Sequence, residues 1–322
     1  MGGDHGSRFC VLAVLDFLQK YPSVRVSLFG RSQEITPIVS TSDYLSRITL
    51  VDCSDVVDMS DSPVFALRHK QSSSMWKSLS ALSDGYVDAC VSGGNTGALV
   101  AISSHLLSSI GNVKRPVICK PIPVESGKSF LLDMGANLSC SSELLVQFAL
   151  LGRLFAEASG VPNPSVALLN VGAEQGKGLP TLREASIALE ADPGTNFVGF
   201  VEGNELFSGR VDVIVCDGFV GNVALKSSEG AARFLMASLR REFQSSAWSR
   251  ILGFMVKPLF MRWAYRYHPS QLNGAVLLGL TQVVIKSHGS ADQLGFFRAL
   301  EAALEYRTKQ TSEKICSHFS GK

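Results

Sequence analysis

One glycine-rich turn has the residue types and spacing of an anion-binding site. Ser92-Gly93-Gly94-Asn95-Thr96-Gly97 follows the apolar residues 87–91, which predict a buried strand, and precedes residues 99–110, whose apolar side chains recur at helical spacing. Such a turn directs several unpaired backbone N–H groups and the positive end of the helix dipole at one point. We predict that residues 92–97 bind phosphate; the alternative is a strand-to-helix turn that binds nothing.

Three other apolar strands are followed by turns of the same kind. Residues 129–132 lead into the turn 133–137, residues 166–169 into 170–178, and residues 211–215 into 216–222. In open parallel sheets, the ligand crevice lies beyond the carboxyl ends of the strands. We therefore expect these turns to meet the turn 92–97 at one end of a sheet and to form a binding cleft.

The signatures of several other enzyme classes do not occur in the sequence. There is no G-x-G-x-x-G, no G-x-x-x-x-G-K-[ST] and no G-x-S-x-G, which disfavours nucleotide-dependent dehydrogenases, P-loop enzymes and serine hydrolases. No histidine is followed by aspartate five residues later, as a glycerol-phosphate acyltransferase would require. No set of cysteines and histidines has metal-ligand spacing. We expect neither a metal nor a cofactor.

Composition limits the class of protein further. A chain of 322 residues with 46% hydrophobic residues can bury a large core, and we interpret residues 1–322 as a single domain. The net charge of +2 gives little reason to expect nucleic acid as a partner. Seven cysteines without a C-x-x-C pair indicate a reducing cytosol, and no signal peptide or spanning apolar run is present. Alternating strands and helices predict an α/β protein with a mostly parallel sheet covered on both faces.

Residues 243–291 contain no acidic residue but several basic and aromatic ones. Ile251, Met255, Leu259 and Trp263 recur every fourth residue, and Pro258 is expected to break the helix into two pieces. We predict a protruding amphipathic helical hairpin at about residues 245–270. Its apolar face could lie on an anionic membrane surface or against protein, in a dimer or in the core, and its basic residues could meet an acidic carrier protein.

Eight segments resemble, in order, signature blocks of the bacterial acyl-carrier-protein:phosphate acyltransferases, the PlsX family. They are residues 1–6, 66–75, 92–98, 131–137, 169–174, 207–213, 216–226 and 286–289. The resemblance implies a homodimeric three-layer α/β/α sandwich like the isocitrate and isopropylmalate dehydrogenases. It also implies that acyl carrier protein bearing an acyl thioester reacts with inorganic phosphate to give acyl phosphate and free carrier. The product would supply a glycerol-3-phosphate acyltransferase in phospholipid synthesis.

The resemblance makes positions matching His5, Lys177 and Asn222 critical for activity. Orthophosphate is already a competent nucleophile and a thiolate leaves readily, so the site must chiefly hold an anion beside a thioester and stabilise an oxyanion. His5 would act as a base or a phosphate donor, Lys177 would neutralise charge, and the Asn222 amide would face the thioester carbonyl. The plainer interpretations are a surface histidine, a solvated loop lysine and a helix N-cap.

Four further residues receive supporting roles. Asp4 would orient His5, and Asp217 would orient Asn222 or only shape its turn. Arg68 could guide phosphate or the phosphopantetheine of the carrier, and is equally compatible with a solvated basic turn. Asn137 belongs to the glycine-rich turn that follows residues 129–132.

The sequence departs from the family pattern in two places. Family members place a strand before the turn that here begins at Met1, so we expect a misassigned start and a native mass above 34.6 kDa. Ala173 stands where the family usually carries an acidic residue beside Glu174. A non-catalytic protein that binds acyl carrier or a membrane surface on the same fold is the alternative function.

Overall fold

The computed structural model describes residues 2–3, 6–125, 127–174, 176–266 and 269–320. The first part of the chain forms helices and strands in the order α1 (Gly6–Lys20), β1 (Val26–Gly30), α2 (Ser32–Val39), β2 (Ile48–Asp52), α3 (Pro63–His69), α4 (Ser74–Ser83), β3 (Ala89–Ser92), α5 (Thr96–Leu106), β4 (Val117–Pro123) and β5 (Lys128–Leu132). The second part forms α6 (Ser142–Ala158), β6 (Val166–Leu169), α7 (Pro180–Glu190), β7 (Phe197–Val201), β8 (Val213–Val215), α8 (Gly218–Gln244), α9 (Ala247–Arg266), β9 (Ala275–Leu278), β10 (Val283–Lys286), α10 (Gln293–Thr308) and α11 (Thr311–Ser320).

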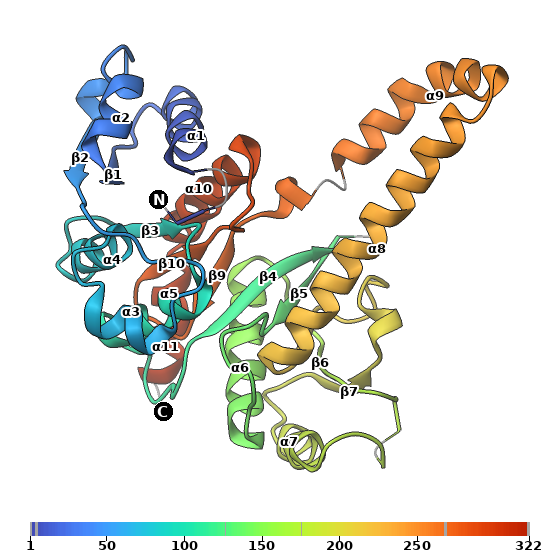
Figure 1. The fold of residues 1–322 in the computed structure, drawn as a ribbon. Helices are drawn as coiled ribbons and strands as arrows, with labels where there is room; N and C mark the ends of the chain where they lie inside the picture. The colour runs from blue at the N-terminus through green and yellow to red at the C-terminus, as the bar shows by residue number, and fades with distance from the viewer. Residues whose placement is uncertain (1, 4–5, 126, 175, 267–268, 321–322) are drawn as a thin grey trace.

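An eight-stranded sheet forms the middle layer, in the order β3-β10-β9-β4-β5-β8-β6-β7 (Figure 1). Strands β6, β8, β9 and β10 are buried on both faces, so that in β8 Val213 and Val215 join one core cluster while Ile214 joins the other. Helices α6, α7, α10 and α11 contribute to the first cluster, and α3, α4, α5 and the beginning of α8 to the second. The predicted three-layer α/β/α fold with a mostly parallel sheet is confirmed.

The strands of the sheet do not all run in one direction. β9 is antiparallel to both of its neighbours, β10 and β4, and β4 is also antiparallel to β5. The remaining four neighbouring pairs are parallel. Consequently β3, β10 and β4 run opposite to β5, β8, β6 and β7. The expectation that four glycine-rich turns meet at one end of the sheet is therefore wrong, because the turn 92–97 lies at the opposite end from the other three.

The sequence patterns do not predict two central strands, β9 and β10. β9 and β10 lie in the stretch interpreted mainly as basic and amphipathic, and each is only four residues long. Both are fully buried inside the sheet, where β9 joins the half containing β3 to the half containing β5. The small parallel sheet of β1 and β2 stands apart from the large sheet.

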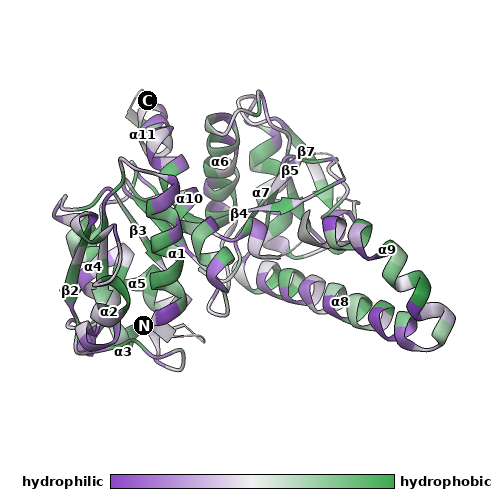
Figure 2. Cartoon of the chain, turned by 90° about the horizontal axis from the view of Figure 1, so that it is seen from above, coloured by the Kyte–Doolittle hydropathy of each residue, from purple (hydrophilic) through white to green (hydrophobic). Residues whose placement is uncertain are grey.

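A helical hairpin projects from the body, but its bounds differ from the prediction. It consists of α8 and α9, so residues 245–270 contain the connection and one arm rather than both arms (Figures 1 and 2). Pro258 lies inside α9 and does not divide it. Residues on either side of Pro258 pack on the same side chain of α8: Gly253 lies against Phe243, and the Phe260 ring meets the Phe243 ring edge-on at 6.5 Å. These contacts hold both halves of α9 in line despite the hydrogen bond that proline cannot make.

Within the parts of the chain that the structure describes, no helix combines the length and apolarity needed to cross a membrane.

Candidate active site

The turn 92–97 is shaped by the Asn95 side chain. Asn95 is the N-cap of α5, and its Oδ1 accepts a hydrogen bond from the Ala98 N–H at 3.0 Å. Its Nδ2 donates to the carbonyl oxygens of Asp58, Met59 and Asp61 at 2.9–3.1 Å. The side chain is thus used within the fold, and the residue is only 8% exposed. Asn95 therefore orients the turn, while backbone N–H groups remain the candidate phosphate donors.

Two glycines let this turn pack against neighbouring helices. A Cβ atom at Gly94 would lie 2.7 Å from Cε of Met75 in α4, and one at Gly97 would lie 2.8 Å from Cγ of Pro63 in α3. Side chains at these positions would push the turn away from both helices. The glycine content of the turn is explained by this packing as well as by the anion-binding hypothesis.

The beginning of the chain lies beside the predicted phosphate turn. A Cβ atom at Gly2 would be 3.6 Å from Cα of Gly94, and one at Gly3 would be 3.1 Å from the carbonyl oxygen of Gly289. The first glycine-rich turn, the turn 92–97 and the turn after β10 therefore meet. His5 and Asp4 lie outside the described residues, so their predicted roles stay predictions.

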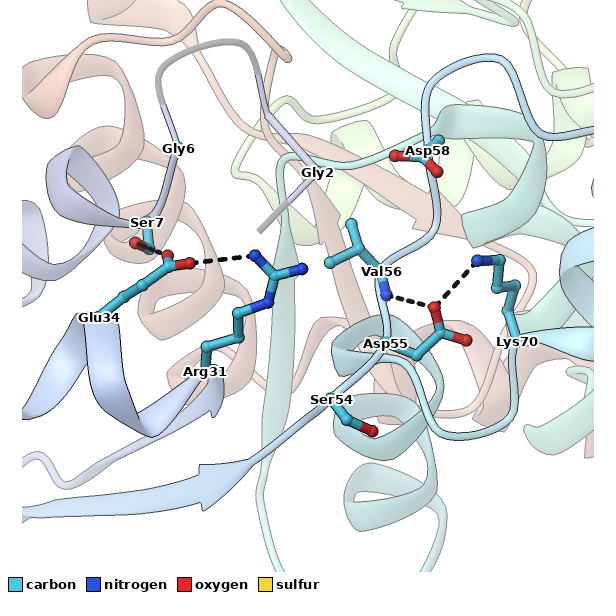
Figure 3. Close-up of a pocket in the computed structure, with 10 residues that line it drawn as sticks. All are labelled: Gly2, Gly6, Ser7, Arg31, Glu34, Ser54, Asp55, Val56, Asp58 and Lys70. Atoms are coloured by element: carbon cyan, nitrogen blue, oxygen red, sulfur yellow. Dashed lines mark hydrogen bonds and ion pairs between the residues drawn. The ribbon is translucent and has the colours of Figure 1, made fainter.

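A cavity of about 430 Å³ opens next to these first residues (Figure 3). Four of its five charged lining residues form two ion pairs, Lys70 with Asp55 at 2.9 Å and Arg31 with Glu34 at 3.2 Å, and the fifth is Asp58. Ser7 adds a hydrogen bond to Glu34 at 2.8 Å. Arg68 is exposed on α3 and is not among the residues that line this cavity.

Asn222 lies at the other end of the sheet, one turn into α8. The N-cap of α8 is Asp217, whose Oδ1 accepts from the Val220 N–H at 2.8 Å. The interpretation of Asn222 as an N-cap is therefore wrong, and Asp217 shapes the start of the helix. Asn222 lies over Gly135, where a Cβ atom would be 3.9 Å from the Asn222 side chain. No described residue forms a hydrogen bond with the exposed Asn222 amide, so it is free to donate to a ligand.

The Asn137 side chain is buried and has a structural role. It is 3% exposed, and its Nδ2 donates to the Pro116 carbonyl at 3.0 Å and to Asp133 Oδ2 at 2.9 Å. The buried Asp133 carboxylate also accepts the backbone N–H groups of Gly135, Ala136 and Asn137. Asp133 and Asn137 together hold the turn on which Asn222 rests.

Lys177 belongs to the loop that follows β6. Its Nζ lies 2.8 Å from Oε1 of Glu174, and the lysine side chain is 54% exposed. The hydrogen bond to Glu174 raises the pKa of Lys177, which therefore stays protonated at neutral pH. Because β6 and β8 are parallel neighbours, this loop lies at the same end of the sheet as Asn222.

Helix α8 extends from this end of the sheet toward the turn 92–97. Lys226, one turn beyond Asn222 and about 6 Å along the helix, places Nζ 2.6 Å from Nε2 of His288. Next to His288, the Ser287 N–H donates to the Ser92 carbonyl at 2.8 Å. The residues predicted for phosphate and for the thioester therefore lie on two opposed strand ends that α8 connects.

Comparison with other proteins identifies the family of this chain. A family model described as "Fatty acid synthesis protein" matches residues 1–314. A phosphate acyltransferase of Teredinibacter turnerae is 47% identical over 98% of this chain and 96% of its own length. A phosphate acyltransferase of Saccharophagus degradans is 49% identical over 98% of this chain and 92% of its own length.

Two solved structures share the fold at low identity. A phosphotransacetylase from Streptococcus pyogenes has a TM-score of 0.59 at 15% identity, with 95% of this chain and 91% of that chain covered. A 4-hydroxythreonine-4-phosphate dehydrogenase from Klebsiella pneumoniae has a TM-score of 0.51 at 13% identity, with 92% and 95% covered. The fold is thus that of the phosphotransacylases and related dehydrogenases. Within that class, the chain belongs to the phosphate acyltransferase family, as the resemblance to the PlsX proteins predicts.

Proposed function

We propose that this protein transfers the acyl group of acyl carrier protein to inorganic phosphate, forming an acyl phosphate for phospholipid synthesis. The observation that carries the proposal is the 47–49% identity, over 98% of the chain, to proteins named phosphate acyltransferase. The groups that the reaction needs lie on two opposed strand ends that α8 connects: a backbone turn suited to an anion on one, and the exposed Asn222 amide and the protonated Lys177 on the other.

The reaction requires few changes of protonation. A phosphate oxygen attacks the carbonyl carbon of the thioester, and the carbonyl oxygen becomes an oxyanion that the Asn222 amide stabilises. The carbon–sulfur bond then breaks, and its electron pair leaves with the carrier thiolate while the acyl phosphate forms. Lys177 offsets negative charge during attack, and the turn 92–97 holds the phosphate with its backbone N–H groups.

The test is phosphate-dependent release of free thiol from acyl carrier protein charged with an acyl chain. We expect thiol and acyl phosphate to appear in equal amounts, and no thiol when phosphate is omitted. If the protein bound acyl carrier but released no thiol, the alternative of a non-catalytic binding protein would replace the proposal.

The exposed side chains of the hairpin support a role in binding another molecule. Trp248 and Phe254 of α9 are 77% and 78% exposed, and neighbouring positions carry Arg250 and Lys257. We propose that the exposed apolar and basic side chains of α9 bind an anionic membrane surface from the cytoplasmic side, or a second copy of the chain in a homodimer. Delivery of acyl phosphate to a membrane-bound glycerol-3-phosphate acyltransferase would favour the first arrangement.

A further inference from the structure

A row of lysines crosses the sheet between the two halves of the site. In the antiparallel pairing of β10 with β9, Lys286 is opposite Ala275. Cys119 of β4 is opposite Val276, so the same register continued by one residue places Lys120 opposite Ala275 from the other side. Directly paired residues project from the same face of a sheet. Lys120 and Lys286 therefore flank the small side chain of Ala275 on the face that α5 and α8 cover.

Helix α8 adds a third lysine above this row. Lys226 contacts Nε2 of His288 at 2.6 Å and Oε2 of Glu229 at 3.2 Å. The charged groups that shift the pKa of His288 are Lys226, Glu229, Lys286 and Lys120, three ammonium groups and one carboxylate. Burial and the neighbouring Lys226 lower the pKa of His288, which is consequently neutral at neutral pH.

Lys120 is the least expected member of this cluster. It lies at a half-buried position in the middle of an otherwise apolar strand, and it has no hydrogen-bond or ion-pair partner among the described residues. Burial lowers its pKa, and only the more distant Glu229 opposes that effect. An ammonium group placed among like charges destabilises the fold unless an anion compensates it. Lysines in such positions are typical of ligand-binding sites.

The cluster adjoins the predicted phosphate turn, whose own side chains supply no positive charge. The Ser287 N–H donates to the Ser92 carbonyl, and a Cβ atom at Gly93 would lie 3.8 Å from the carbonyl oxygen of His288. Backbone N–H groups and lysine ammonium groups are therefore available from adjacent segments. A tetrahedral phosphate group, whose oxygens are negatively charged and accept hydrogen bonds, would be complementary to both.

We propose that Lys120, Lys226, Lys286 and His288 form a binding site for a phosphate group beside the turn 92–97. The proposal rests on the function proposed above, because that function supplies two phosphate sources. One is the free orthophosphate that attacks the thioester, and the other is the phosphodiester in the prosthetic group of the carrier protein. The lysines would hold either one by charge, and neutral His288 would hold Lys226 in position.

Thermal unfolding with and without ligand tests the site independently of catalysis. A ligand that binds only the folded protein raises its melting temperature, so inorganic phosphate should stabilise the wild type. Lys120→Met should raise the melting temperature without phosphate, because a half-buried charge without an ion-pair partner is removed, and should abolish the increase caused by phosphate. Lys226→Gln, at an exposed position, should reduce that increase without altering the fold. The matched control is Lys114→Gln, which removes an exposed lysine far from the cluster and should leave the increase unchanged.

Calorimetric titration then distinguishes the two sources. If Lys120→Met and Lys226→Gln weaken the binding of inorganic phosphate at least about tenfold, the site holds orthophosphate. If they weaken only the binding of 4′-phosphopantetheine, the site holds the phosphodiester of the carrier. If both variants bind both probes like the wild type, the proposal is overturned. Weakened phosphate binding in a protein that releases no thiol would retain this site and reject the acyltransferase function.

Discussion

Gly221 in α8 touches the carbonyl of Asp133 so closely that a Cβ atom at position 221 would lie 1.9 Å from the Asp133 oxygen. The same Cβ atom would lie 2.8 Å from Sγ of Cys216. The first turn of α8 therefore rests directly on the end of β5, and this contact determines where Asn222 and Lys226 lie over the sheet.

Gly221→Ala should destabilise the protein by about 1–3 kcal/mol, because the methyl group must displace backbone rather than a flexible side chain. The matched control is Gly230→Ala in the same helix, where a Cβ atom would have no neighbour within 4 Å. That change should stabilise the protein by about 0.5–1 kcal/mol, since alanine is more favourable than glycine in a helix interior. Chemical denaturation measures both, and equal effects at the two positions would contradict the packing.

Lys177→Ala should lower kcat/KM for phosphate-dependent thiol release by roughly tenfold or more while the melting temperature stays unchanged. Lys114→Ala provides the control, because Lys114 is also exposed and also pairs with a glutamate, Glu143, at 3.3 Å. It lies outside the site and should retain the wild-type rate. Wild-type kinetics in Lys177→Ala would remove Lys177 from the mechanism.

Asn222→Ala should reduce the catalytic rate, whereas Asn137→Ala should reduce stability. The Asn222 amide is exposed and has no described partner, so its loss should reduce kcat/KM by roughly tenfold or more and leave stability intact. Asn137 is buried with two hydrogen bonds, so its loss should cost about 1–3 kcal/mol of stability. Steady-state kinetics and denaturation on both variants separate the roles; a destabilised Asn222→Ala with normal kinetics would reverse our assignment.

The free energy of unfolding should fall on acidification in a way that depends on His288. Its pKa in the folded protein is lowered, so below pH 6.5 the unfolded state takes up the proton first, and stability decreases as the pH falls toward the folded-state pKa. His288→Gln should remove this part of the slope. Denaturation at several pH values in phosphate-free buffer measures it, and identical slopes in both proteins would show that His288 is not perturbed.

The apolar face of the hairpin should bind vesicles that contain anionic lipid. Trp263→Glu places a charge among the exposed apolar side chains of α9 and should reduce flotation with the vesicles, whereas Tyr86→Glu, at an exposed position on the body, should not. If the wild type does not float, the membrane arrangement is excluded and contact with a second chain remains. Sedimentation analysis of the same variants then reports whether Trp263→Glu dissociates a dimer.

Local sequence patterns predicted most elements but not their pairing. The apolar runs at 87–91, 129–132, 166–169 and 211–215 are strands whose bounds agree with the prediction to within two residues. β9 and β10 were missed because four-residue strands beside a basic amphipathic stretch give too short an apolar signal. Pro258 was misjudged because contacts with Phe243 on α8 outweigh a local helix-breaking preference.

The sequence alone determined the three-layer class, the family and the glycine-rich turns, because these depend on short-range residue patterns and on the order of motifs. Only the tertiary structure decided which turns meet. The direction of β3 relative to β5 depends on three antiparallel pairings between segments far apart in the chain. Those pairings also bring Lys120 and Lys286 to either side of Ala275. The tertiary structure likewise gives Asn95 and Asn137 their hydrogen bonds to backbone carbonyls of distant segments, which no local sequence pattern could predict.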